Sequence, residues 1–268
     1  MIINELRIFQ EFIRTASNLY RLGWDERNGG NISCQIDEAE VRKCFKTDEI
    51  IREFKTDFDI TELVGRYFLV TGTGKYFKNV EYNPEENLGL IKVLDNHRLG
   101  LLWGFAGNGA PTSELPSHFM GHIERLKVDP NQKVVIHCHP TNIIAMTFTH
   151  SLDEKEFTRT LWQMSTECLV VFPEGVSVLP WMLCGTDEIG VETSKKLRDT
   201  RMVVWAQHGI FGTGSTIDEA FGLIETAEKA AEIFNKIDGK KIYQTITYED
   251  LKTLAAKFKV TPRKGYLS

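Results

Sequence analysis

Apolar residues recur along the chain at two different spacings, and these spacings predict alternating helices and strands. Over residues 4–22, apolar side chains stand three and four positions apart, which is typical of one face of an amphipathic helix. We expect its buried stripe to consist of Leu6, Phe9, Ile13, Ala16 and Tyr20. The same spacing predicts further helices over residues 112–127, from about 142, and over 157–164, 186–199, 217–236 and 248–258.

Short apolar runs between polar or glycine-rich stretches predict strands. They lie at 32–36, 67–71, 88–94, 99–105, 134–139, 168–172 and 202–206. Residues 37–65 are charged and lack a clear period, so we expect them to be peripheral. Because helices and strands interleave without a long linker, the pattern predicts one α/β domain over residues 1–268, with helices packed against a central sheet.

Composition narrows the functional classes. The formal net charge of −5 gives no reason to expect nucleic acid as a partner. The five cysteines are widely spaced and include no Cys-x-x-Cys pair, which argues against a disulfide framework and against a zinc ribbon. Charged residues interrupt the first helix, and no run of about 20 uncharged apolar residues occurs. We therefore expect a cytoplasmic protein with no membrane partner.

Two histidines close the predicted strand at 134–139, in the sequence VVIHCHP. Because side chains alternate between the faces of a strand, His137 and His139 share one face and Cys138 points to the other. The Cα atoms of the two histidines would be roughly 7 Å apart, so both rings can reach one small object. A metal ion, a catalytic pair and chance are the alternatives, and an in-phase pair at a strand end favours the metal.

A third ligand is expected from another strand end, because catalytic zinc sites commonly use three protein ligands. His208 is the best candidate, since it follows the buried strand at 202–206 and precedes Gly209. Its rivals are His97, His118, His122 and His150. His118 and His122 lie four residues apart on one helix, but that helix lacks the glutamate of a zinc-protease motif. We interpret this pair as a solvent-facing part of the helix.

Three stretches have the composition of an anion site. Asn28-Gly29-Gly30-Asn31 and Thr71-Gly-Thr-Gly-Lys75 combine glycines with amide and hydroxyl donors, so that backbone N–H groups can converge. Thr112 and Ser113 begin a helix, and the positive end of a helix favours an anion. The second stretch is no Walker A loop, because Tyr76 stands where serine or threonine is required. A phosphorylated small molecule therefore becomes an attractive ligand.

Two carboxylates are candidates for acid–base chemistry. Glu114 belongs to the first turn of the helix at 112–127, where it either interacts with the helix dipole or exchanges a substrate proton. Glu167 precedes the run CLVVF and is the second candidate. Asp25 and Glu26 are expected to form ion pairs with the neighbouring Arg27.

The motifs WDERNGGN, LVTGTGK, PTSELPSH, IHCHPTN, STECLVVFPEG and QHG occur in an order and spacing that resemble the class II sugar-phosphate aldolase family, over nearly the whole chain. The resemblance implies a mixed central sheet flanked by helices in a three-layer arrangement. It also implies a homotetramer with active sites near subunit interfaces. One Zn²⁺ per subunit would be bound by the residues that match the family ligands, His137, His139 and His208.

The resemblance also assigns roles to single residues. Glu114 matches the catalytic acid/base, and Glu167 matches a residue that reaches a neighbouring subunit's site and handles the aldehyde end of the substrate. The substrate and its phosphate would be held by Asn28, Gly29, Asn31, Thr73, Gly74, Thr112 and Ser113. Thr73 departs from the serine expected in this motif but keeps the hydroxyl group.

The reaction implied by the resemblance is the reversible retro-aldol cleavage of L-rhamnulose 1-phosphate, in rhamnose catabolism. The products would be dihydroxyacetone phosphate and L-lactaldehyde, formed through an enediolate that the zinc stabilises. Cleavage of L-fuculose 1-phosphate and epimerisation of ribulose 5-phosphate are alternatives within the family. A non-catalytic assembly domain like the adducin head is the alternative from another class, which the presence of all three histidines disfavours.

Overall fold

One mixed sheet forms the centre of the molecule in the computed structural model, which describes residues 3–268. The first two residues of the predicted 1–268 domain lie outside the described residues. The sheet has the strand order β2-β5-β4-β3-β1-β6-β9-β8-β7, and among the described strands β7 and β8 are the one parallel pair. The strands are β1 (Asn31–Ile36), β2 (Arg52–Lys55), β3 (Tyr67–Thr71), β4 (Leu88–Val93), β5 (Arg98–Gly104), β6 (Val134–Cys138), β7 (Ser177–Leu179), β8 (Met202–Trp205) and β9 (Gly209–Gly214).

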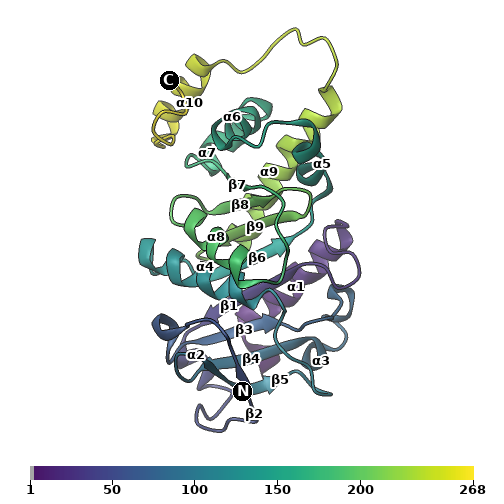
Figure 1. Cartoon of the computed structure of the whole chain (residues 1–268), viewed down its shortest axis with the longest axis vertical. Coiled ribbons are helices and arrows are strands. Elements are labelled where there is room, and N and C mark those ends of the chain that lie inside the picture. Colours follow the sequence, from purple (N-terminus) through teal and green to yellow (C-terminus); the bar gives the residue numbers. More distant parts are fainter. Residues whose placement is uncertain (1–2) are drawn as a thin grey trace.

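Helices cover both faces of this sheet, which confirms the α/β fold with a mixed sheet flanked by helices. The α-helices are α1 (Arg7–Arg21), α2 (Glu38–Val41), α3 (Pro84–Asn87), α4 (Leu115–Val128), α5 (Thr141–Thr149), α6 (Glu154–Met164), α7 (Thr166–Val171), α8 (Asp187–Lys196), α9 (Ile217–Ile237) and α10 (Tyr248–Phe258). Figure 1 shows the strands stacked along the long axis, with α4 and α8 on one side and α1, α5 and α9 on the other.

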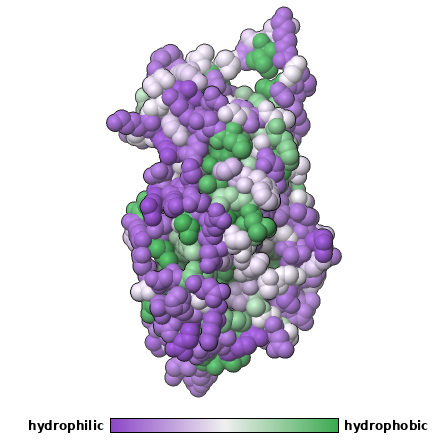
Figure 2. All heavy atoms as spheres, viewed as in Figure 1, coloured by the Kyte–Doolittle hydropathy of each residue, from purple (hydrophilic) through white to green (hydrophobic). Residues whose placement is uncertain are grey.

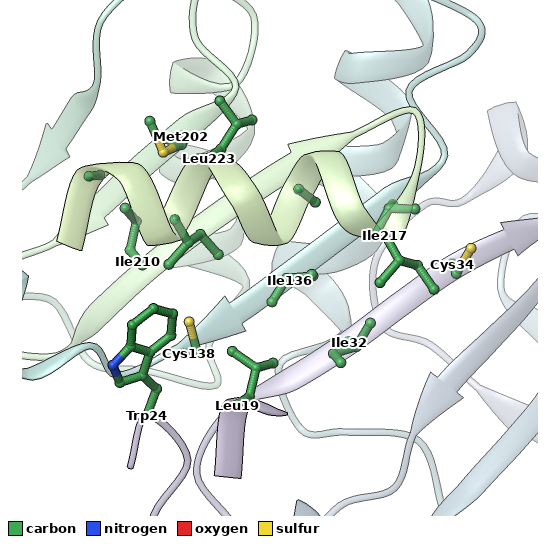
Figure 3. Close-up of a cluster of buried hydrophobic side chains, with 14 of the residues drawn as sticks. Leu19, Trp24, Ile32, Cys34, Ile136, Cys138, Met202, Ile210, Ile217 and Leu223 are labelled. Carbon is green, nitrogen blue, oxygen red and sulfur yellow. The ribbon is translucent and has the colours of Figure 1, made fainter. Parts of the chain in front are cut away.

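The alternation of side chains along β6 divides the core between these two layers. Val134, Ile136 and Cys138 belong to the large cluster under α1 and α9, and Val135 belongs to the cluster under α8. Figure 3 shows Ile136 and Cys138 on the same side of the sheet as Ile210 of β9. Cys138 therefore faces away from the histidines, as predicted.

The first helix is present as predicted, but its buried stripe differs by part of a turn. Phe9, Phe12, Ala16 and Leu19 are buried, whereas Tyr20 is 45% exposed. The prediction for Tyr20 was therefore wrong. The side chain of Phe12 is wholly apolar, whereas that of Tyr20 carries a hydroxyl group. The helix has apolar residues on both sides of the predicted stripe. Only packing against the sheet selects which of them face the core.

The strand predicted at residues 168–172 is wrong. Thr166–Val171 forms the short helix α7, with Cys168 and Leu169 buried in the large cluster together with residues of α6 and α9. A short apolar run has no period long enough to separate a strand from a buried helix. In this chain the run enters the helical layer and not the sheet.

Three strands were not expected from the sequence. β2 lies inside the stretch 37–65 and forms one edge of the sheet, which agrees with the peripheral position predicted for that stretch. β7 forms the other edge, and β9 lies inside the sheet with all six residues buried. β9 contains three glycines in GIFGTG, so its apolar pattern is too weak to recognise.

The surface is largely hydrophilic, with hydrophobic patches near the middle of the face shown in Figure 2. Phe148, Trp181 and Leu183 are among the large apolar side chains that are at least 64% exposed. Within residues 3–268, no helix combines the length and the apolar character that a bilayer crossing requires.

The buried position of Ile136 predicts a large effect on stability. Ile136→Ala removes a fully buried side chain between β6 and the α1–α9 layer, so the free energy of unfolding should fall by roughly 2–5 kcal/mol. Urea unfolding at one fixed protein concentration measures this change. The matched control is Ile51→Ala, because Ile51 is 68% exposed; equal urea midpoints for the two variants would contradict this account of the core.

Candidate metal centre and active site

Antiparallel pairing brings three distant segments together at one end of the central strands. Asn31 at the start of β1 pairs with His137 near the end of β6, and Cys138 pairs with Ile210 near the start of β9. His208 lies in the tight turn between β8 and β9, whose ends pair at Trp205 and Gly209. The predicted ligands therefore meet although about 70 residues separate the two segments that carry them.

The three histidines form a compact cluster. The ring centroids of His137 and His139 are 5.1 Å apart, and the ring of His208 lies 5.0 Å from each of them. One nitrogen from each ring lies within 4.8 Å of the other two. The ring of His137 stacks on Phe211 at 4.4 Å, which holds its orientation. This geometry brings together the three residues that the sequence predicted as metal ligands.

The hydrogen bonds of His137 and His139 leave the Nε2 atom of each ring free to bind a metal. His137 Nδ1 lies 3.0 Å from the carbonyl oxygen of Ile210, and His139 Nδ1 lies 3.1 Å from the carboxylate of Glu26. Each Nδ1 must therefore donate, so each Nε2 carries a lone pair. Both Nε2 atoms are buried and have no hydrogen-bond partner within residues 3–268. Buried lone pairs without a donor fit a divalent cation held by three imidazoles.

The surroundings keep the imidazoles of His137 and His208 neutral, which is the form that binds metal. Burial, with a smaller contribution from the neighbouring His139, lowers the pKa of His208 to about 4. Burial also holds the pKa of His137 well below its ordinary value, with further lowering by His139 and His208. At neutral pH both rings keep a free lone pair, so no proton competes with a cation.

Glu114 lies directly beside the cluster. Its carboxylate oxygens are 3.5 Å from Nε2 of His137 and 3.9 Å from Nε2 of His208. It is only 8% exposed, and burial raises the pKa of its carboxyl group, whereas the hydrogen bond from Asn31 Nδ2 at 2.9 Å acts in the opposite direction. The residue is the N-cap of α4 and so lies just before the first turn in which it was expected, and its side chain makes no capping hydrogen bond. A buried carboxyl group at this distance can exchange a proton with a molecule bound at the histidines.

The predicted anion-binding turns lie at the same end of the central strands as the histidines. Gly72 bridges to Pro111, and the backbone N–H of Thr73 donates to the carbonyl of Ala110 at 2.9 Å. Asn28, Thr73, Gly74 and Ser113 are exposed, and Gly29 is half-buried against the ring of His139. Gly74 has a φ of +67°, a conformation that glycine adopts without strain. The backbone N–H groups of Gly72, Thr73 and Thr112 are bonded within the protein, so the turns present mainly the hydroxyls of Thr73 and Ser113 and the backbone of Gly74.

Two predicted anion ligands already have partners inside the protein. The Thr112 hydroxyl accepts a hydrogen bond from the backbone N–H of Glu114 at 3.2 Å. Asn31 is buried, and its amide contacts both Glu114 and His118. The structure thus gives Asn31 a position between the metal centre and the core of the sheet.

The interpretation of His118 and His122 as solvent-facing was wrong. Both side chains are fully buried, because α4 lays this face on the sheet and not toward water. Both contact Ser33 of β1 at 2.7 Å. The sequence did contain a signal: Asn31, Ser33 and Gln35 alternate with apolar residues in β1, and two histidines at helical spacing can pair with such a polar row.

The predicted ion pairs of Asp25 and Glu26 with Arg27 were also wrong. Glu26 contacts His139 instead, as described above. Asp25 is buried with no hydrogen-bond partner among the described residues, and burial raises the pKa of its carboxyl group. A neighbouring charge in the sequence cannot reach a carboxylate that the turn directs into the protein. The contact of Glu26 with a candidate ligand was not visible in the sequence.

Glu167 lies in a different place. It stands in the first turn of α7 and lines a cavity of about 420 Å³ together with Trp24, Ser165 and Glu225. The structure does not bring Glu167 into the groups of potential ligands that include His137, His208 and Glu114.

The fold and the site can now be compared with known proteins. The family described as "Class II Aldolase and Adducin N-terminal domain" matches residues 10–234. The chain belongs to this family. A rhamnulose-1-phosphate aldolase of Listeria monocytogenes serotype 4a (strain HCC23) is 58% identical over 261 residues, which cover 97% of this chain and 96% of the relative. A rhamnulose-1-phosphate aldolase of Enterococcus faecalis (strain ATCC 700802 / V583) is 55% identical, over 96% of this chain and 93% of the relative.

Solved structures of class II aldolases have the same fold. A sugar-phosphate aldolase from Thermotoga maritima superposes with a TM-score of 0.75 at 29% identity, covering 88% of this chain and 97% of that chain. An L-fuculose 1-phosphate aldolase has a TM-score of 0.60 at 20% identity, over 94% of this chain and 96% of that chain. The second similarity shows the fold alone.

Gly209 offers a test of the metal centre. A Cβ atom at this position would collide with the carbonyl oxygen of Cys138 and lie 2.9 Å from the ring of His139. Gly209→Ala should therefore displace the ring and lower the metal content to less than half of the parent value. Elemental analysis of dialysed protein measures the content and identifies the metal in the parent. In the matched control Gly222→Ala the added Cβ has open space; a similar metal content in both variants would count against the predicted centre.

Proposed function

We propose that this chain catalyses the reversible retro-aldol cleavage of L-rhamnulose 1-phosphate to dihydroxyacetone phosphate and L-lactaldehyde. The observation that carries the proposal is the cluster of His137, His139 and His208 beside Glu114. The buried Nε2 atoms of His137 and His139 have no partner among the described residues. The 58% identity to a rhamnulose-1-phosphate aldolase over nearly the full length supports the choice of substrate.

A zinc ion is the proposed cofactor, held by His137, His139 and His208. Three neutral imidazoles with an open fourth position are typical of catalytic zinc. The ion would supply Lewis-acid polarisation of the ketose oxygens. Around it, the contacts of His137 with Ile210 and of His139 with Glu26 hold the rings in the tautomer that presents Nε2.

Glu114 is the proposed acid/base. Breaking the C3–C4 bond leaves electron density at C3, and this carbon must gain a proton before dihydroxyacetone phosphate is released. The burial of Glu114 raises the pKa of its carboxyl group, so the residue holds a proton more readily than an exposed glutamate. The distances of 3.5 and 3.9 Å from its carboxylate to Nε2 of His137 and of His208 support this role, because a molecule bound at the histidines would contact it.

The glycine-rich turns are proposed to hold the phosphate. The backbone of Gly74 and the exposed side chains of Asn28, Thr73 and Ser113 offer donors at this end of the strands, while the N–H of Gly29 is bonded to Glu26 and shapes the first turn. Thr112 contributes by fixing the start of α4, because its hydroxyl is bonded to the backbone of Glu114. Binding energy from the phosphate would orient the reacting carbons near Glu114.

The role of Glu167 and the assembly stay predictions. Glu167 lies in its own cavity, so a contribution to catalysis requires the site of a neighbouring subunit, as in the proposed homotetramer. The cytoplasmic location is likewise a prediction from the sequence.

A substrate panel tests the proposed activity. Cleavage followed by a coupled assay for dihydroxyacetone phosphate should be fastest with L-rhamnulose 1-phosphate and at least tenfold slower with L-fuculose 1-phosphate. With ribulose 5-phosphate, the epimer is measured separately. Preference for either of the other sugars would replace the proposed substrate. A metal-loaded protein that turns over none of the three would support a non-catalytic domain.

Glu114→Gln tests the acid/base. The amide keeps the size of the side chain but cannot hold and release the proton, so kcat should fall by roughly 10²–10⁴. Substrate binding, followed by calorimetry, should be retained. Glu124→Gln is the matched control, because Glu124 lies on the same helix and pairs with Arg198 away from the histidines. Equal rates for Glu114→Gln and the parent would leave Glu114 with only a role at the helix start.

A further inference from the structure

A chain of hydrogen bonds runs from the metal centre into the core between β1 and α4. Asn31 Nδ2 donates to Glu114 at 2.9 Å, and Asn31 Oδ1 contacts Nε2 of His118. The other nitrogen of His118 contacts the Ser33 hydroxyl at 2.7 Å, and the same hydroxyl contacts Nε2 of His122 at 2.7 Å. The chain thus links Glu114 to a residue two turns further along α4.

The donor and acceptor properties of these atoms allow the hydrogen bonds of this series to run in one direction. An amide oxygen only accepts, so Nε2 of His118 carries the proton and its Nδ1 carries a lone pair. The Ser33 hydroxyl must then donate to His118, and it accepts from Nε2–H of His122. The remaining Nδ1 of His122 is buried and has no partner among the described residues, as expected for the bare end of such a chain.

The surroundings keep this arrangement from changing. Ser33, His118 and His122 are fully buried. Burial lowers the pKa of His118 to about 3 and holds that of His122 well below its ordinary value, so both rings are neutral and have one N–H each. The ring of His118 packs against Phe211, and that of His122 against Phe68 and Phe119. Water cannot easily offer an alternative partner in such a pocket.

We propose that Ser33, His118 and His122 are positioning residues that hold the Asn31 amide with its NH₂ group toward Glu114, and so aim the carboxylate for proton transfer. Without the Ser33 hydroxyl, His118 is free to carry its proton on Nδ1. Its Nε2 lone pair would then face the oxygen of Asn31, which favours rotation of the amide. The rotated amide would present its oxygen to Glu114, and the carboxylate would lose its donor. The inference rests on the proposed acid/base function of Glu114.

Ser33→Ala tests the hydrogen-bonded series by removing one of its members away from the substrate. We expect kcat to fall at least tenfold, while KM stays within twofold and the metal content is unchanged. Because the proton transfer would become slower than the other steps, the ratio of kcat in H₂O to kcat in D₂O should rise. Ser33→Thr keeps the hydroxyl and should restore most of the rate. His118→Phe keeps a ring of similar shape but removes both nitrogens, and should reproduce the effects of Ser33→Ala.

Ser177→Ala is the matched control, because Ser177 is also a fully buried serine of the sheet and its hydroxyl contacts Thr200 instead. It should leave kcat and the isotope ratio at parental values. The positioning role is overturned if Ser33→Ala and His118→Phe match the parent, or if their loss of rate follows a loss of bound metal. Absence of cleavage by the parent would instead overturn the proposed function and, with it, this role.

Discussion

The antiparallel pairing of β6 with β1 on one side and with β9 on the other is the constraint on which the site depends. It brings the start of β1, the end of β6 and the β8–β9 turn to the same end of the central strands. The pairing of Asn31 with His137 sets the distance between the polar row of β1 and the metal centre. Gly209 must be small, because any side chain there would meet the histidines. The ladder of backbone bonds thus positions the ligands with the rigidity of a sheet and not of a loop.

A second property follows from the same pairing: polar groups are buried on both sides of the ligands. The contacts of His137 and His139 select their tautomers from outside the cluster. Ser33, His118 and His122 occupy the layer beneath α4, where apolar side chains would be the usual choice. Burying polar groups is costly unless they are hydrogen-bonded, and Asn31, Ser33 and His118 all have partners. Among the described residues around the site, Asp25, His122, His137 and His139 carry buried atoms without a partner, and the last two face the proposed metal.

The electrostatics of the centre act in a common direction. Burial lowers the pKa of His137 and His208 and raises that of Glu114, so each group favours its neutral form. Neutral imidazoles can accept a cation, and a glutamate that is easily protonated suits the return of a proton to carbon. A bound cation would in turn favour the ionised carboxylate, so the metal and the proton are coupled at Glu114.

The amino-acid sequence was enough to predict the α/β class, most helices and strands, and the three histidines that cluster, because alternation along β6 and the strand end before Gly209 are local properties. It did not determine α7 or β9, whose short or glycine-rich runs carry no clear period. Packing between distant segments gives the remaining contacts: α4 faces the sheet with His118 and His122, Glu26 reaches His139, and Asn31 contacts Glu114. These contacts join segments up to 113 residues apart. They depend on which strands become neighbours, and no spacing within a single segment records that choice.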